Sequence, residues 1–178
     1  MKYYLFSFLL IASALSPAFS QNTKQDAPEP IRPLTQTKEL SDEDSIREVV
    51  FKKVIGPWMK EFDSSLAAHF LDTYYIAVDD DKDPSPELLE RFSGLLRPVR
   101  KASESYISEP EGSVVKDKKT NKNGVLFKVS RIKWVNKNVV TLTAGSYIAN
   151  MGSDGCRYTL NRVNGAWSIA AEEECFVS

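Results

Sequence analysis

The chain has 178 residues, of which 24 are acidic and 23 basic, so its formal net charge is −1. A balance this close to neutral argues against a dedicated nucleic-acid binder, which needs a surplus of positive charge to meet the phosphates. With 42% hydrophobic residues, the chain is long enough for one domain with a buried core.

The segment 1–20 has the layout of a secretory signal peptide. Lys2 supplies a positive start, and residues 3–15 form an apolar run that is too short to span a bilayer. Ala18 and Ser20 are small residues three and one positions before a cleavage site that we expect between Ser20 and Gln21. We therefore expect an exported protein, periplasmic or extracellular, that has no membrane span.

Residues 21–40 contain three prolines and little to bury, and we interpret them as a flexible leader. A single domain is expected over residues 41–178. Ser41 is placed to cap a helix whose apolar residues recur at helical spacing. Gly56-Pro57 should stop or kink this helix.

The next elements are a strand and a second helix. Residues 69–78 are rich in aromatic and branched side chains, which predicts a largely covered strand. Asp79 to Asp83 then form a polar turn. Ser85 followed by Pro86 is typical of a helix start, and Pro98 should end that helix.

Beyond about residue 114 the apolar residues recur with a period of two, which predicts antiparallel strands joined by hairpins. A strand over residues 125–135 should contain a bulge near Ser130. The loop 136–138 should pair Trp134 with Val140.

Two more turns are predicted near the C-terminus. One covers residues 152–155, and the other is Asn164-Gly165, which should pair Leu160 with Ile169. The resulting fold class is α+β, a curved antiparallel sheet of about five or six strands packed by two or three helices.

Cys156 and Cys175 are the only cysteines. An even pair in an exported chain predicts a disulfide. Plain pairing around the last turn leaves the two residues diagonal, near the limit of separation for a relaxed bond. We therefore also expect a bulge or bend in this hairpin.

Catalytic groups are sparse. The chain has no Gly-x-Ser-x-Gly motif, and His69 is its one histidine. Asp72 could orient His69 as a general base, but residues three apart in a strand point to opposite faces, which favours an ordinary half-buried histidine. We keep His69, Asp72, Tyr74 and Tyr75 as candidates for lining a pocket. The sequence assigns no catalytic, cofactor-binding or metal-ligating residue, and no cofactor.

The acidic loop resembles a calcium-binding loop in its spacing. Positions one, three, five, nine and twelve of the EF-hand pattern are filled by Asp79, Asp81, Asp83, Glu87 and Glu90. Position six, where the pattern needs glycine, is Pro84, whose φ is locked negative. This favours a solvated turn that leads into a capped helix.

A basic segment runs from Lys116 to Lys137, with eight basic residues against one acid. It could contact polyanions or anionic lipids weakly. The expected contact residues are Lys116, Lys118, Lys119 and Lys122. The simpler interpretation is a solvated turn and strand face.

Two resemblances concern short stretches. Residues 158–169 (YTLNRVNGAWSI) resemble the closing hairpin of nuclear-transport-factor-two-like (SnoaL-like) proteins, which are cone-shaped α+β proteins. Residues 82–92, 116–120 and 145–147 look like parts of an exported bacterial α+β family with no assigned activity. The first resemblance implies a His–Asp or Tyr–Asp pair in the cone, which here could come only from the four pocket candidates.

The sequence therefore favours a small exported protein that binds a protein or small-molecule ligand without catalysis. The alternative is a small cone-fold enzyme, a hydrolase or isomerase, with a pocket near His69, Asp72 and Tyr74. Fold alone does not decide between these classes.

Overall fold

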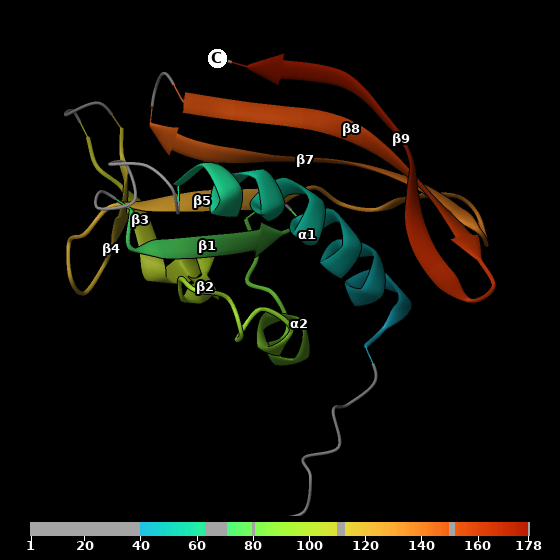
Figure 1. Ribbon diagram of the computed structural model, residues 1–178, viewed down its shortest axis with the longest axis horizontal. Helices are drawn as coiled ribbons and strands as arrows, with labels where there is room; N and C mark the ends of the chain where they lie inside the picture. Colours follow the sequence, from blue (N-terminus) through green and yellow to red (C-terminus); the bar gives the residue numbers. More distant parts are fainter. Residues whose placement is uncertain (1–39, 63–70, 80, 110–112, 150–151, 178) are drawn as a thin grey trace, which may run out of the picture. The chain divides into compact units, whose positions relative to one another are not determined.

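The computed structural model describes residues 40–62, 71–79, 81–109, 113–149 and 152–177. These residues form an α+β domain with a seven-stranded sheet and a separate two-stranded sheet (Figure 1). In chain order the elements are α1 (Asp42–Phe62), β1 (Thr73–Val78), α2 (Pro86–Glu90), β2 (Val99–Lys101), the 3-10 turn η2 (Ala102–Glu104), β3 (Ser105–Ile107), β4 (Val115–Asp117), β5 (Gly124–Val129), β6 (Lys133–Asn136), β7 (Val139–Ala149), β8 (Gly152–Val163) and β9 (Ala166–Val177).

The large sheet is mixed, which corrects the expectation of a smaller antiparallel sheet. Its strands follow the order β2-β1-β5-β7-β8-β9, and β6 pairs with β7. β1 is parallel to both β2 and β5, whereas the other pairs are antiparallel. Parallel neighbours need a crossover connection. Along the chain, α2 forms part of the connection from β1 to β2, and the β3–β4 ribbon forms part of the connection from β2 to β5.

The two α-helices of the described chain begin where the sequence predicted. The Ser41 hydroxyl accepts a hydrogen bond from the Asp44 amide at 3.1 Å, and the Ser85 hydroxyl caps α2 through the Leu88 amide. α1 continues past Pro57 rather than stopping there. α2 is only five residues long, so the expected helix up to Pro98 is wrong beyond its first turn.

The main core lies between the large sheet and the helices. Tyr74, Ile76, Val125 and Phe127 point to this side and are almost fully buried. α1 crosses this face of the sheet (Figure 1). The core is continued along the long strands and α1 by residues that include Ile46, Val50, Phe51, Ile55, Val140, Leu142, Tyr158 and Leu160.

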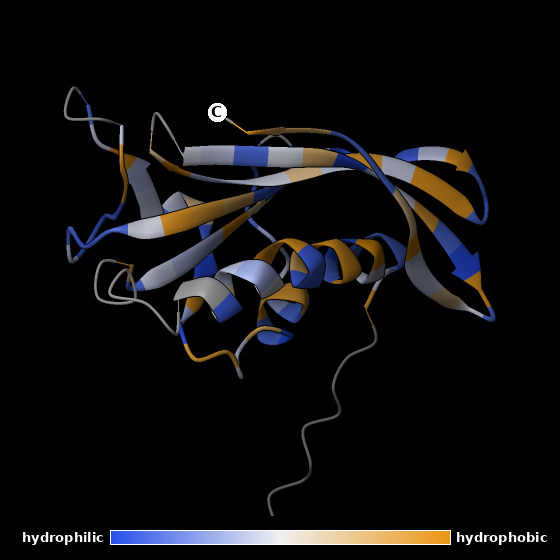
Figure 2. Cartoon of the chain, turned by 45° about the horizontal axis from the view of Figure 1, so that its top comes forward, coloured by the Kyte–Doolittle hydropathy of each residue, from blue (hydrophilic) through white to orange (hydrophobic). Residues whose placement is uncertain are grey.

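The opposite face, which we call the outer face, is covered only in part. Tyr75, Ala77 and Leu126 pack there against Val115 of β4. β1 is therefore buried on both faces, which explains its continuous run of apolar and aromatic residues. Where the cover ends, the outer faces of β7 and β8 are left open, and hydrophobic and hydrophilic residues alternate along these long strands (Figure 2).

The hairpin registers match the prediction in their central pairs. Trp134 lies opposite Val140, and Leu160 lies opposite Ile169. Instead of one strand with a bulge near Ser130, the structure has two strands, β5 and β6, that are interrupted at this point and both pair with β7. The predicted turn over residues 152–155 is wrong, because Gly152 begins β8 and these residues pair with β7.

Candidate functional site

A groove of about 610 Å³ lies on the outer face of the sheet. Its floor is formed by residues of β7 and β8 that share this face, namely Thr143, Gly145, Ser153 and Gly155. Ile107 of β3, Tyr147 of β7 and Phe176 of β9 also line it. Its volume is in the range of small-molecule sites, and its aromatic and aliphatic lining suits an apolar ligand body.

Two glycines facing each other keep the floor low. Gly145 is paired with Gly155, which is paired in turn with Phe176. A side chain at Gly145 would collide with the Asp154 carbonyl oxygen, and a Cβ on Gly155 would lie 2.7 Å from the Phe176 ring. The groove therefore depends on the absence of side chains at both positions, and the Phe176 ring lies across Gly155.

The ionisable groups lining the groove have protein partners. The Lys128 ammonium lies 2.6 Å from an Asp81 carboxylate oxygen, and the Tyr147 hydroxyl donates to the Ser113 carbonyl oxygen at 2.9 Å. The Asp154 carboxylate accepts hydrogen bonds from the amide and hydroxyl of Ser146. A site with partnered charges and an apolar wall is better suited to holding a ligand than to proton transfer.

A buried carboxylate holds the basic turn that follows β4. Asp117 accepts hydrogen bonds from the Tyr75 hydroxyl at 2.6 Å and from Arg100 at 2.9 Å. Its other oxygen accepts from the amides of Lys119 and Thr120. The Tyr75 hydrogen bond is the largest cause that holds the pKa of Asp117 well below its usual range, while burial of Tyr75 and its bond to Asp117 raise the pKa of Tyr75. These bonds assign Asp117 and Tyr75 a structural role.

A second buried network fixes the start of α1. The Arg47 guanidinium donates to Asp44 at 3.0 Å and to both carboxylate oxygens of Asp79 at 2.9 Å. The Ser85 hydroxyl donates to Asp44 at 2.6 Å, so the network also holds the start of α2. Burial alone would lower the pKa of Arg47, but its hydrogen bonds to Asp44 and Asp79 raise it above the usual value.

The acids of the calcium-like spacing separate in the structure. Asp79 binds Arg47, Asp81 pairs with Lys128, and Asp83 accepts hydrogen bonds from Ser103. The loop follows strand β1 rather than a helix. The three carboxylates therefore serve three different contacts instead of converging on one point.

The predicted cysteine pair forms a disulfide between β8 and β9. The register of this hairpin shifts twice, between Gly155 and Arg157 and between Thr159 and Leu160. These shifts are the predicted irregularity, and they bring Cys156 and Cys175 opposite each other with a Cα–Cα distance of 4.1 Å.

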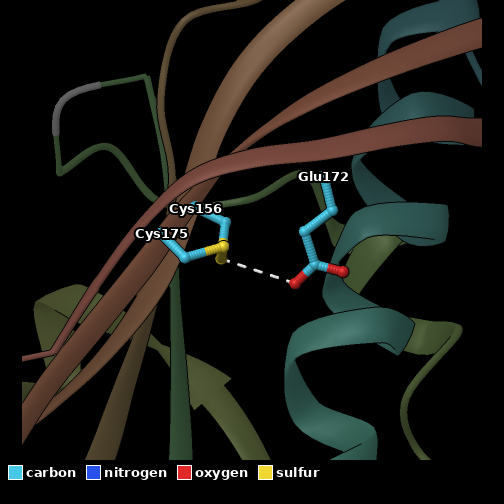
Figure 3. Close-up of side chains that lie close together, drawn as sticks. All are labelled: Cys156, Glu172 and Cys175. Carbon is cyan, nitrogen blue, oxygen red and sulfur yellow. Dashed lines mark hydrogen bonds between the residues drawn. A yellow bond between two sulfur atoms is a disulfide. The ribbon is translucent and has the colours of Figure 1, made fainter.

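Glu172 lies beside this disulfide. One oxygen of its carboxylate lies 3.4 Å from Sγ of Cys156, and Figure 3 shows the side chain turned toward the disulfide. Its other oxygen lies 2.7 Å from the ammonium of Lys53 on α1. Burial of Tyr158, together with the charge of Glu172 nearby, raises the pKa of Tyr158 to about 12. Two cysteines and a carboxylate are potential metal ligands, but bonded sulfurs are not thiolates, so the closed disulfide does not offer a metal site.

The four pocket candidates from the sequence are not brought together. His69 lies outside the described residues. Asp72 is exposed and pairs with Lys122 at 3.5 Å. Tyr74 packs in the main core against Phe127, and Tyr75 points to the opposite face of β1 and binds Asp117.

The four predicted contact lysines lie in β4 and in the turn between β4 and β5. The ammonium of Lys118 donates to the Ser103 carbonyl oxygen, and that of Lys122 reaches Asp72. Lys119 is exposed, and Lys116 lies opposite Tyr106 on the β3–β4 ribbon.

The predicted signal peptide and leader fall outside the described residues, except for Leu40. In the described part of the chain, neither helix combines the length and the apolar character that a bilayer crossing requires.

The groove is the feature that sequence reasoning missed. Its lining draws on five strands, β3, β5, β7, β8 and β9, and only the register of β7 with β8 reveals that Gly145 and Gly155 face each other. Comparison with models of known protein families, with curated proteins and with solved structures found no match.

Proposed function

We propose that this chain is an exported, non-catalytic binding module of the cell envelope or extracellular space, and that the outer-face groove is its ligand site. The observation that carries the proposal is the apolar groove of about 610 Å³ above the paired Gly145 and Gly155. A disulfide and the layout of the first residues support the exported setting.

The chemistry of the lining favours a ligand with an apolar body. Ile107, Tyr147 and Phe176 offer apolar contact area, while Lys128 and Asp81 already neutralise each other at the edge of the site. An exposed ion pair of this kind contributes little to stability, so a ligand carrying a polar end can displace either partner at low cost.

The test uses N-phenylnaphthylamine, a neutral apolar fluorophore, as the probe. Its emission should rise saturably on binding the native protein. Thr143→Trp places an indole ring on the groove floor and should weaken probe binding by about ten-fold or more, since that ring occupies much of the site.

Thr141→Trp is the matched control. Thr141 lies two residues earlier on the same strand and the same face, outside the groove lining. Its variant should bind the probe as the native protein does. Equal binding by the native protein and Thr143→Trp, with both variants folded by circular dichroism, would exclude the groove as the ligand site.

A further inference from the structure

Exposed apolar side chains gather at the turn ends of the two C-terminal hairpins. Trp134 and Val135 of β6 are 46% and 62% exposed, and Val163 at the end of β8 is 59% exposed. The two turns lie side by side, because the Arg162 amide donates to the Asn138 carbonyl oxygen at 2.8 Å. Figure 1 shows the β8–β9 turn at the edge of the domain.

Two lysines lie close to Trp134 and Val135 in the sequence. Lys133 and Lys137 flank Trp134 and Val135, and both lysines are exposed. The chain has no acidic residue between Asp117 and Asp154. Among the described residues, no carboxylate pairs with either lysine. We call Lys133, Trp134, Val135, Lys137 and Val163 the hairpin tip.

The position of Trp134 is fixed by packing. Its ring meets the buried Trp167 ring edge-to-face, with a centroid distance of 5.7 Å. The guanidinium of Arg162 lies 5.8 Å from the centroid of the Trp167 ring and binds Asp42 at 2.9 Å. The tip therefore presents a tryptophan that is 46% exposed and packs its ring against the buried Trp167.

The composition of the tip selects among possible partners. Tryptophan favours the level of the lipid headgroups, valine the edge of the acyl chains, and lysine the anionic phosphates. If two copies of this chain met through the tip, the lysines of one copy would lie near the same lysines of the other and repel them. A peptide strand recognised by its side chains needs pockets, and the groove residues include no member of the tip.

We propose that the hairpin tip docks this protein onto the surface of membranes that contain anionic phospholipids. Val135 and Val163 enter the interface, Trp134 lies at headgroup level, and Lys133 and Lys137 meet lipid phosphates. The inference goes beyond the groove proposal, because the tip and the groove share no residue.

The experiment is cosedimentation of the mature protein with vesicles of phosphatidylglycerol and phosphatidylcholine, compared with pure phosphatidylcholine. Lys133→Gln/Lys137→Gln should weaken partitioning by about 25-fold, from about five-fold per lysine. Val135→Ser/Val163→Ser should weaken it by about ten-fold through lost apolar burial. Trp134→Phe should keep most binding and lose the blue shift of tryptophan emission on vesicle addition.

The matched control is Lys119→Gln/Lys122→Gln, which removes the same charge from the turn after β4. This variant should keep its partitioning to within about two-fold, because its lysines lie outside the docking surface. All variants should match the native protein in far-ultraviolet circular dichroism and unfold cooperatively in urea, which separates lost binding from lost folding.

Four results would overturn the proposal. Native protein that does not sediment with anionic vesicles, or sediments equally with neutral ones, contradicts anionic-lipid docking. Greater loss in the control than in Lys133→Gln/Lys137→Gln places the contact at the lysine turn instead. If the protein binds heparin as tightly as it binds vesicles, and Val135→Ser/Val163→Ser leaves heparin binding unchanged, the partner is a polyanion. A lipid-free dimer that dissociates in that valine variant indicates a second copy of the chain.

Discussion

Replacing both cysteines by serine should lower the free energy of unfolding by about 3 kcal/mol. The disulfide joins residues separated by 19 positions, and the chain-entropy relation gives a loop of this length about 3 kcal/mol at 25 °C. The closed loop contains the whole β8–β9 turn. Within the loop, β9 carries Glu172, Glu173 and Glu174 in succession. Two of these carboxylates are paired with basic groups, Glu172 with Lys53 and Glu174 with Arg157, so the expected loss comes from the freed unfolded chain.

The assay is urea unfolding of oxidised native protein and of Cys156→Ser/Cys175→Ser, followed by far-ultraviolet circular dichroism. A loss of about 3 kcal/mol corresponds to a fall of roughly 10 °C in the melting temperature for a domain of this size. Reduced native protein serves as the control and should unfold at the same urea concentration as the serine variant. Coincident curves for the oxidised protein and the variant would refute the argument that the link constrains the unfolded chain, and two free thiols in exported material would refute the link itself.

The remaining predictions concern Glu174, Asp117 and the cleavage site before Gln21. Glu174 has a φ of 48°, so Glu174→Gly should be more stable to unfolding than Glu174→Ala by about 1 kcal/mol. Glu173 has no positive φ, so there the alanine variant should be the more stable one. If urea unfolding ranks the two variants in the same order at both positions, the left-handed backbone at Glu174 is contradicted. The pKa of Asp117 lies below its usual value chiefly because Tyr75 donates to it, so its contribution to stability is present above about pH 4 and is lost as the pH falls further. Asp117→Asn should therefore flatten the acid decline of unfolding free energy, and equal slopes for both proteins would count against this role. Mass spectrometry of protein recovered from the periplasm or medium should give a chain starting at Gln21, and a mature pool that keeps the first methionine would exclude the cleavage.

Local signals were sufficient for the helix starts and the hairpin registers. Ser85 and Pro86 specify the start of α2 within one turn of chain, and Asn164-Gly165 specifies the pairing of Leu160 with Ile169. Both depend on residues close in sequence, so propensity and capping decide them.

Long-range pairing could not be predicted in the same way. β2 is three residues long, too short for its period to be recognised, and its parallel pairing with β1 depends on tertiary packing. The groove needs two facts that no local pattern carries: Gly145 faces Gly155 across two strands, and Ile107 approaches from a separate sheet. The sequence suggested a turn over residues 152–155 because of its glycines, whereas the structure uses Gly155 as floor beneath Phe176.

The most direct test of the groove as the ligand site is a titration of ¹⁵N-labelled protein with N-phenylnaphthylamine, followed by amide chemical shifts. Glycine amides report each region separately: Gly145 and Gly155 lie in the groove floor, whereas Gly165 lies in the last hairpin turn. We expect saturable shifts at Gly145 and Gly155 and none at Gly165. Saturable binding that leaves Gly145 and Gly155 unshifted would contradict the account.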